Sequence, residues 1–196
     1  MVVPTYSKKF LRRGNFIRNA FANARVFFIL RLSKRLCVHA QINSMIPNAI
    51  IVHHSASNIN TPISEIDRWH KQRNFTKSSL GFFVGYHYVI LADGKLIQTR
   101  RDNELGCHTI PNDGKIGICC VGNFMLENPT ASQLQTLRVL CNRLKKDYNI
   151  NEVKGHRDFS RTECPGDNLY LYVLQDKISW LKKLIETLLK TFRLHA

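Results

Sequence analysis

The segment from Gly155 to Gly166 has the sequence GHRDFSRTECPG and contains two candidate metal ligands. It places the imidazole of His156 and the thiol of Cys164 eight residues apart, and a Cys-Pro-Gly turn closes it. Imidazole and thiolate are the side-chain groups that bind zinc best near neutral pH. The segment therefore predicts two ligands of a zinc ion, and a site of this kind needs a third.

A candidate for the third ligand lies about a hundred residues earlier, at the end of an apolar run. Residues 50–52 (Ile-Ile-Val) are typical of a short buried strand, and His53 and His54 follow them. Neighbouring residues of a strand point to opposite faces, so these two histidines cannot easily both reach one metal. Two histidines, one cysteine and a water form an open zinc site of the catalytic type, because structural sites usually have four protein ligands.

Five motifs follow one another along the chain, and they lie at 52–56 (VHHSA), 85–88 (GYHY), 106–108 (GCH), 116–124 (IGI with VGNF) and 155–166 (GHRD with TECPG). Together they closely resemble the zinc-dependent N-acetylmuramoyl-L-alanine amidases, which include phage lysozyme-type amidases and animal peptidoglycan recognition proteins. The likeness covers roughly residues 47–182. It implies a hydrolase with a Zn²⁺ cofactor that cleaves the amide between N-acetylmuramic acid and L-alanine in peptidoglycan or muropeptides.

The resemblance also implies roles for individual residues. It selects His53, together with His156 and Cys164, as the metal ligands. It places Tyr86 beside the zinc, along with Thr162 two residues before the cysteine, so these are the expected catalytic residues. Tyr86 would orient the attacking water or accept its proton, and Thr162 would hydrogen-bond the developing oxyanion.

His108 and Asn112 are the expected substrate-binding residues. By resemblance, the Gly-x-His motif lines the cleft for the muramyl group and the stem peptide, which makes His108 the stronger candidate. Asn112 is also explained as a turn residue beside Pro111 and Gly114. Arg68 is a further candidate for the groove.

Other residues of the motifs are expected to be structural. Some family members carry a glutamate, a candidate base, directly after the Ile-Gly-Ile motif, but this chain has Cys119 there, followed by Cys120. Two cysteines on a central strand are most simply core residues with one thiol on each face. Arg157 and Asp158 are expected to hold the loop of His156 rather than to take part in chemistry.

From Met45 onward the pattern predicts an α/β fold, a single domain with a central mixed β-sheet flanked by helices. An Asp-Gly hairpin turn is expected at residues 93–94. Thr61 is the expected N-cap of the first helix, and Thr130 with Gln133 matches the spacing of a capping box. Strands are expected at 50–53, 82–91, 96–99 and 116–121, and helices at 62–70, 130–148 and 171–188, the last long and amphipathic.

The first 44 residues form a basic extension to the amidase domain expected at 45–196. They hold nine Lys or Arg and no acid, which leaves +6 of the formal charge of +15 for the remainder. Three interpretations stay open: a disordered arm or upstream extension before Met45, a targeting segment, and an amphipathic helix that binds an anionic membrane or wall polymer. A secretory signal fits less well, because Arg25 and Arg31 limit the best apolar run to five residues.

Six cysteines without a Cys-x-x-Cys pair favour reduced thiols. The apolar runs fall short of the roughly 18 residues of a membrane span, so the chain is not expected to be an integral membrane protein. We also expect a monomer that is made in the cytoplasm without a clear signal peptide. Its substrate would be the cell wall or cytoplasmic muropeptides. A nucleic-acid binder with a structural zinc would need a fourth protein ligand as well as aromatics interleaved with Lys and Arg. The arm has the charge and some phenylalanines, but only three ligands are found, so this function is not expected. A non-catalytic peptidoglycan-binding module is the main alternative. By resemblance such modules lack the cysteine ligand, so Cys164 favours the enzyme.

Overall fold

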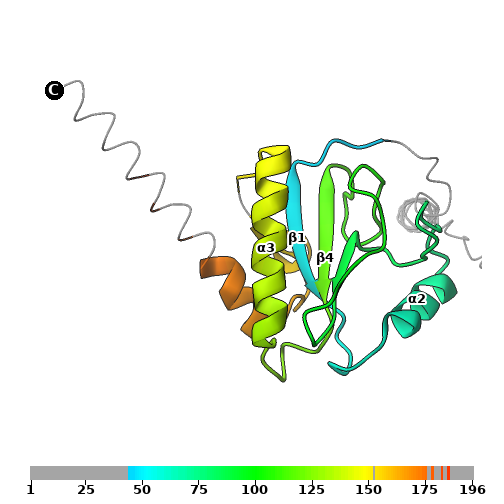
Figure 1. The fold of residues 1–196 in the computed structure, drawn as a ribbon, viewed down its shortest axis with the longest axis horizontal. Coiled ribbons are helices and arrows are strands. Elements are labelled where there is room, and N and C mark those ends of the chain that lie inside the picture. Colours follow the sequence, from blue (N-terminus) through cyan, green and yellow to red (C-terminus); the bar gives the residue numbers. More distant parts are fainter. Residues whose placement is uncertain (1–43, 152, 176–177, 179–181, 183–184, 186–196) are drawn as a thin grey trace, which may run out of the picture. The chain divides into compact units, whose positions relative to one another are not determined.

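The structure is a computed structural model that describes residues 44–151, 153–175, 178, 182 and 185 (Figure 1). At its centre lies a five-stranded sheet in the order β3-β2-β4-β1-β5. The strands are β1 (Ala49–His54), β2 (Tyr88–Ile90), β3 (Leu96–Gln98), β4 (Lys115–Cys120) and β5 (Val153–Gly155). β1 runs parallel to β4 and β5, β2 runs parallel to β4, and β3 is antiparallel to β2. The α/β fold with a central mixed sheet is thereby confirmed.

Helices cover both faces of the sheet (Figure 1). α3 (Ala131–Tyr148) and a helix that begins at residue 167 bury Leu137, Leu144 and Leu169 against one face. α2 (Ile63–Gln72) packs Ile66 against the other face, which carries Cys119. β1 and β4 are therefore covered on both sides, which explains why both are nearly continuous apolar runs.

The helix boundaries follow local capping chemistry. The hydroxyl of Thr130 accepts the backbone N–H of Gln133 at 3.0 Å, and the Gln133 side chain accepts the N–H of Thr130 at 3.0 Å, so the predicted capping box is confirmed. Asn149 in the left-handed conformation ends α3. The N-cap of α2 was predicted one residue too early, because Pro62 rather than Thr61 occupies that position.

The predicted strand at 82–91 is wrong over its first half, since β2 begins only at Tyr88. The preceding backbone bonds to side chains of α2 instead of to a neighbouring strand. Asp67 accepts the N–H groups of Phe83 and Val84, and His70 Nδ1 accepts the N–H of Gly85 at 3.0 Å. These bonds satisfy the donors that a strand ladder would otherwise use.

The Asp-Gly turn between β2 and β3 is confirmed. The N–H of Leu91 donates to the carbonyl of Lys95 at 3.0 Å, and Asp93 accepts the N–H of Lys95 at 2.8 Å. Gly94 has φ of 85°, a conformation that glycine adopts without steric cost.

The described cysteines differ in oxidation state. Among the described residues, Cys119, Cys120, Cys141 and Cys164 are not in disulfides, whereas Cys107 is disulfide-bonded, which corrects the expectation of reduced thiols throughout. Sparse spacing argues against a disulfide framework, but it does not exclude a single bond.

The predicted ends of the chain are described only in part. The basic arm at 1–44, apart from Ser44, and most of the predicted helix beyond residue 175 lie outside the described residues. In the part that is described, the last helix exposes Leu171, Ile178 and Ile185 by more than half of their surface. Among the residues that the structure places, no helix has both the length and the apolar character of a membrane span.

Candidate metal centre and cleft

The three predicted metal ligands come together at one edge of the sheet. His53 lies at the end of β1, and His156 directly follows β5, which runs parallel to β1, so both reach the edge where these strands end. Cys164 lies in the loop after the 3-10 turn η1 (His156–Asp158). One ligand atom from each residue can be chosen so that all three lie within 4.8 Å of one another.

The geometry of this group fits zinc. Typical zinc bonds of about 2.05 Å to nitrogen and 2.3 Å to sulfur, set at a tetrahedral angle, separate the two ligand atoms by about 3.6 Å. The distance from Cys164 Sγ to His53 Nδ1 is 3.6 Å. The centroids of the His53 and His156 rings lie 4.6 Å apart, with the ring planes tilted by 50°. Three protein ligands leave a fourth tetrahedral position for water or substrate.

His54 lies on the opposite face of β1, as the alternation of a strand predicts. Its Nδ1 accepts the backbone N–H of Phe124 at 3.3 Å, which ties β1 to the loop after β4. Burial, and then the nearby charge of Arg157, lower the pKa of His54 to about 4. This histidine is thus a neutral structural acceptor.

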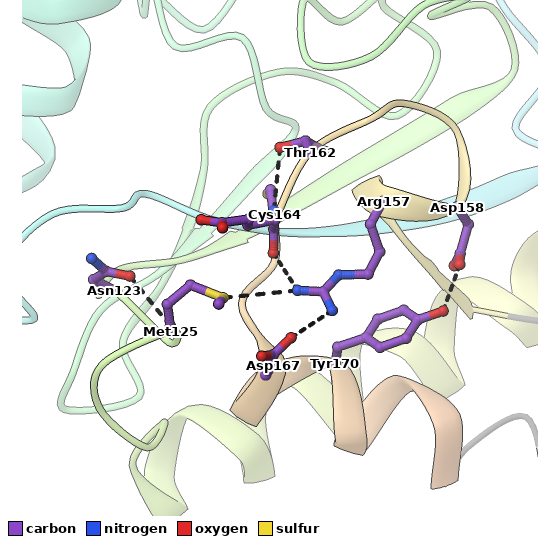
Figure 2. Close-up of polar contacts among 9 residues, drawn as sticks. Asn123, Met125, Arg157, Asp158, Thr162, Cys164, Asp167 and Tyr170 are labelled. Carbon is purple, nitrogen blue, oxygen red and sulfur yellow. Dashed lines mark hydrogen bonds and ion pairs between the residues drawn. The ribbon is translucent and has the colours of Figure 1, made fainter.

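Arg157 holds the loop that carries the candidate ligands (Figure 2). Its backbone N–H donates to the carbonyl of Cys164 at 2.9 Å, and its guanidinium donates to the carbonyl of Glu163. The same guanidinium pairs with Asp167 at 2.6 Å and lies over the ring of Tyr170, 4.7 Å from its centroid. The backbone and side chain of Arg157 together therefore connect the two ends of the loop and tie the loop to the start of the last helix.

Asp158 fixes the other end of the loop (Figure 2). One carboxylate oxygen accepts the N–H of Gly155 at 2.8 Å, and the other accepts the hydroxyl of Tyr170 at 2.5 Å. These bonds hold the backbone on both sides of His156. The expected structural roles of Arg157 and Asp158 agree with these contacts.

The two predicted catalytic residues flank the ligand group. The ring of Tyr86 lies 5.0 Å from that of His53, centroid to centroid. Burial raises the pKa of Tyr86 well above its usual value, with further contributions from Cys119 and Cys164, so the phenol is protonated and can donate. Thr162 is exposed, and its oxygen accepts the N–H of Cys164 at 3.2 Å, which leaves its own O–H free to donate elsewhere (Figure 2).

His87 faces away from the ligand group, so only one residue of the Tyr-His pair lies beside it. Its Nε2 donates to the carbonyl of Glu104 at 2.8 Å, and its Nδ1 accepts the N–H of Gly117 at 3.0 Å. Burial lowers the pKa of His87 to about 4, and burial also lowers that of His70, the acceptor of Gly85, to about 4. Both histidines are neutral parts of the core.

His108 contacts a candidate ligand directly. Its Nδ1 lies 3.1 Å from Nε2 of His53, and its Nε2 lies 3.1 Å from the carbonyl oxygen of Lys115. Burial lowers its pKa well below the usual value. The side-chain oxygen of Asn112 accepts the N–H groups of both His108 and Thr109 at 2.9 Å, as a turn residue would. Substrate binding by His108 and Asn112 stays a prediction.

The family profile described as N-acetylmuramoyl-L-alanine amidase matches residues 43–167. The chain belongs to this amidase family. The endolysin of Enterobacteria phage T3 is 33% identical over 129 residues, which cover 62% of this chain and 82% of the endolysin. Peptidoglycan recognition protein 1 of Bos taurus is 36% identical over 133 residues, covering 64% and 70% of the two chains. The solved structure of the amidase LysC from Clostridium intestinale URNW is 35% identical, with a TM-score of 0.58 over 67% of this chain and 87% of LysC.

In this member of the amidase family, a cavity of about 380 Å³ opens beside Tyr86. Trp69 and Arg73 of the α2 end line it together with Ser55 from the loop after β1. Sequence reasoning missed Trp69 and Arg73. The helical spacing of Ile66, Trp69 and Arg73, three and then four residues apart, is the signal that places them on one face. Arg68, a further candidate for the groove, pairs with Glu65 at the exposed surface of α2 and does not line this cavity, so its role in substrate binding stays a prediction.

Proposed function

We propose that the protein is a zinc-dependent amidase that hydrolyses the bond between N-acetylmuramic acid and L-alanine in peptidoglycan or muropeptides. The observation that supports this most directly is the group formed by His53, His156 and Cys164, whose nitrogen-to-sulfur distance of 3.6 Å matches a tetrahedral zinc site. Membership of the amidase family and relatives named amidase and endolysin support the same reaction.

Bound zinc supplies a Lewis acid that polarises the scissile carbonyl and acidifies water. The protein supplies the orientation around it. Tyr86 lies beside His53 and orients the attacking water through its hydroxyl, while the O–H of Thr162 donates to the oxygen on which negative charge develops. The cavity lined by Trp69 and Arg73 receives the part of the substrate next to the scissile bond.

A peptidoglycan-binding module without catalysis is the alternative function. It is favoured by the similarity to peptidoglycan recognition protein 1, whose name describes recognition alone. Cys164 argues against it, because a module that only binds has no need for a thiol placed at zinc distance from His53.

The test is mass spectrometry of purified peptidoglycan and of soluble muropeptides after incubation with the zinc-loaded full chain. We expect free peptides that begin with L-alanine, and glycan that has lost them. Cys164→Ser, which exchanges sulfur for oxygen with little change in volume, should lose zinc and product together. If the zinc-loaded wild type binds peptidoglycan but releases no peptide, the amidase proposal is wrong and the binding module is correct.

A further inference from the structure

We infer that His108 is a positioning residue that holds His53 in the tautomer and orientation that present Nδ1 to the metal. The inference rests on the proposed zinc role of His53. It concerns how the ligand is prepared rather than which residues bind the metal.

The tautomers follow from a chain of hydrogen bonds that begins at a backbone carbonyl. The oxygen of Lys115 can only accept, so Nε2 of His108, 3.1 Å away, carries the proton and donates it. In the neutral ring, Nδ1 of His108 is then an acceptor, and the group 3.1 Å from it is Nε2–H of His53. Nδ1 of His53 is left with a free lone pair.

That lone pair lies where a metal would need it. Nδ1 is the His53 nitrogen found 3.6 Å from the sulfur of Cys164. His53 is 1% exposed and His108 is 8% exposed, so water does not readily replace either bond. A histidine ligand whose second nitrogen donates to a fixed acceptor is held in place and made more basic, and loss of such an acceptor weakens metal binding.

The ring of His108 occupies a slot formed by two glycines of the family motifs. A Cβ added at Gly106 would lie 2.5 Å from Cδ2 of His108, and one added at Gly117 would lie 2.6 Å from the same atom. Asn112 fixes the backbone of His108 by accepting its N–H. The ring position is thus set by backbone on two sides, which is what a precise acceptor for His53 requires.

Both nitrogens of His108 are engaged within the protein, so a substrate could bond to them only by breaking this chain of hydrogen bonds. The positioning role and the predicted substrate-binding role therefore make different predictions. Loss of the acceptor should change zinc affinity in the first case. It should change KM at constant zinc affinity in the second.

The experiment compares two amide variants of the full chain, His108→Asn and His108→Gln. The asparagine oxygen can take the place of Nδ1 and accept from His53. Glutamine carries its amide further out, near the carbonyl of Lys115, and places a methylene beside His53. We expect zinc affinity, measured by competition with a chelator, to stay within about threefold for Asn and to fall by about 10- to 100-fold for Gln. The thiolate-to-metal absorption of the cobalt(II) form should be retained in the Asn variant and altered in the Gln variant.

Equal zinc affinity in both variants, with a raised KM for muropeptides, would assign His108 to substrate and overturn the inference. An equal loss in both would also overturn it, because the presence of an acceptor would then not matter. If the Gln variant does not fold, His108→Leu replaces it with the same expected loss. Failure of the wild type to bind zinc would refute the proposed metal centre itself, which distinguishes the two hypotheses.

Discussion

Acid should destabilise this protein before most of its carboxylates are protonated, because His70 and His87 are buried as neutral acceptors. Burial lowers the pKa of each from 6.5 to about 4. Between about pH 6.5 and pH 4, therefore, these two histidines are protonated in the unfolded chain but remain neutral in the folded chain. The stability that these two neutral histidines contribute is fully present above pH 6.5 and is lost as the pH falls toward 4.

The size of the effect follows from the two shifts. A shift of about 2.5 pKa units at about 1.4 kcal/mol per unit gives roughly 3 kcal/mol per histidine once both states have titrated. Around pH 5 the two residues together should lower the free energy of unfolding by about 2.4 kcal/mol for each pH unit of acidification. The total free energy of unfolding of a typical domain is only about 5–15 kcal/mol.

The assay is urea unfolding of the zinc-free protein between pH 7 and pH 4.5, followed by far-UV circular dichroism. His87→Asn is the matched variant, since its side-chain oxygen can still accept the N–H of Gly117 but cannot be protonated. This variant should be less stable than wild type at pH 7, and around pH 5 its free energy of unfolding should fall less steeply with acidification, by about 1.2 kcal/mol per pH unit. Equal slopes for the two proteins, or a wild type whose stability is unchanged between pH 7 and pH 5, would refute the reasoning.

Three further predictions concern the site and the arm. Tyr86→Phe should lower kcat by about 10²-fold with zinc still bound. Cys119→Ala should leave kcat nearly unchanged. Wild-type turnover by the Tyr86→Phe variant would remove Tyr86 from the mechanism. Burial raises the pKa of the Cys164 thiol to about 11, so zinc affinity should rise about tenfold per pH unit between pH 7 and pH 10 as one proton is displaced. A flat profile in a chelator titration would show that no thiol proton is released. Replacing the nine Lys and Arg of residues 1–44 by Gln should weaken binding to anionic vesicles or walls, least so at high salt, and leave turnover of soluble muropeptides unchanged. Reduced turnover on the small substrate would mean that the arm supports the fold.

The sequence predicted the features that depend on local patterns. Residues 50–52 and 116–121 are apolar runs of the kind that central parallel strands require, and the capping box at Thr130 is a matter of four neighbouring residues. The candidate ligand set was accessible only in part from the pattern, which shows a histidine pair at the end of a strand and a Cys-Pro-Gly turn. The choice of His53 over His54 came from the resemblance to the amidase family.

Features that depend on distant partners could not be predicted. Residues 82–87 have a strand-like composition, but Asp67 and His70 on α2 accept the backbone N–H groups of residues 83–85. The contacts of His108 with His53 and Lys115 likewise need the register of β1 and β4, and no spacing in the sequence supplies it. The sequence shows the residues that can form such contacts, but not which partners they find.

The candidate ligands His53 and Cys164 are 111 residues apart in the chain, and His156 comes from the segment after a different strand. A metal held there would fasten the end of β1 to the loop after β5 and would bind the native state but not a disordered one. Zinc at a thousand times its dissociation constant would then add about 4 kcal/mol to the stability of the fold. If the proposed zinc site is correct, metal supply would affect how long the protein survives proteases as well as its activity, so that zinc scarcity would lower the amount of protein along with its activity.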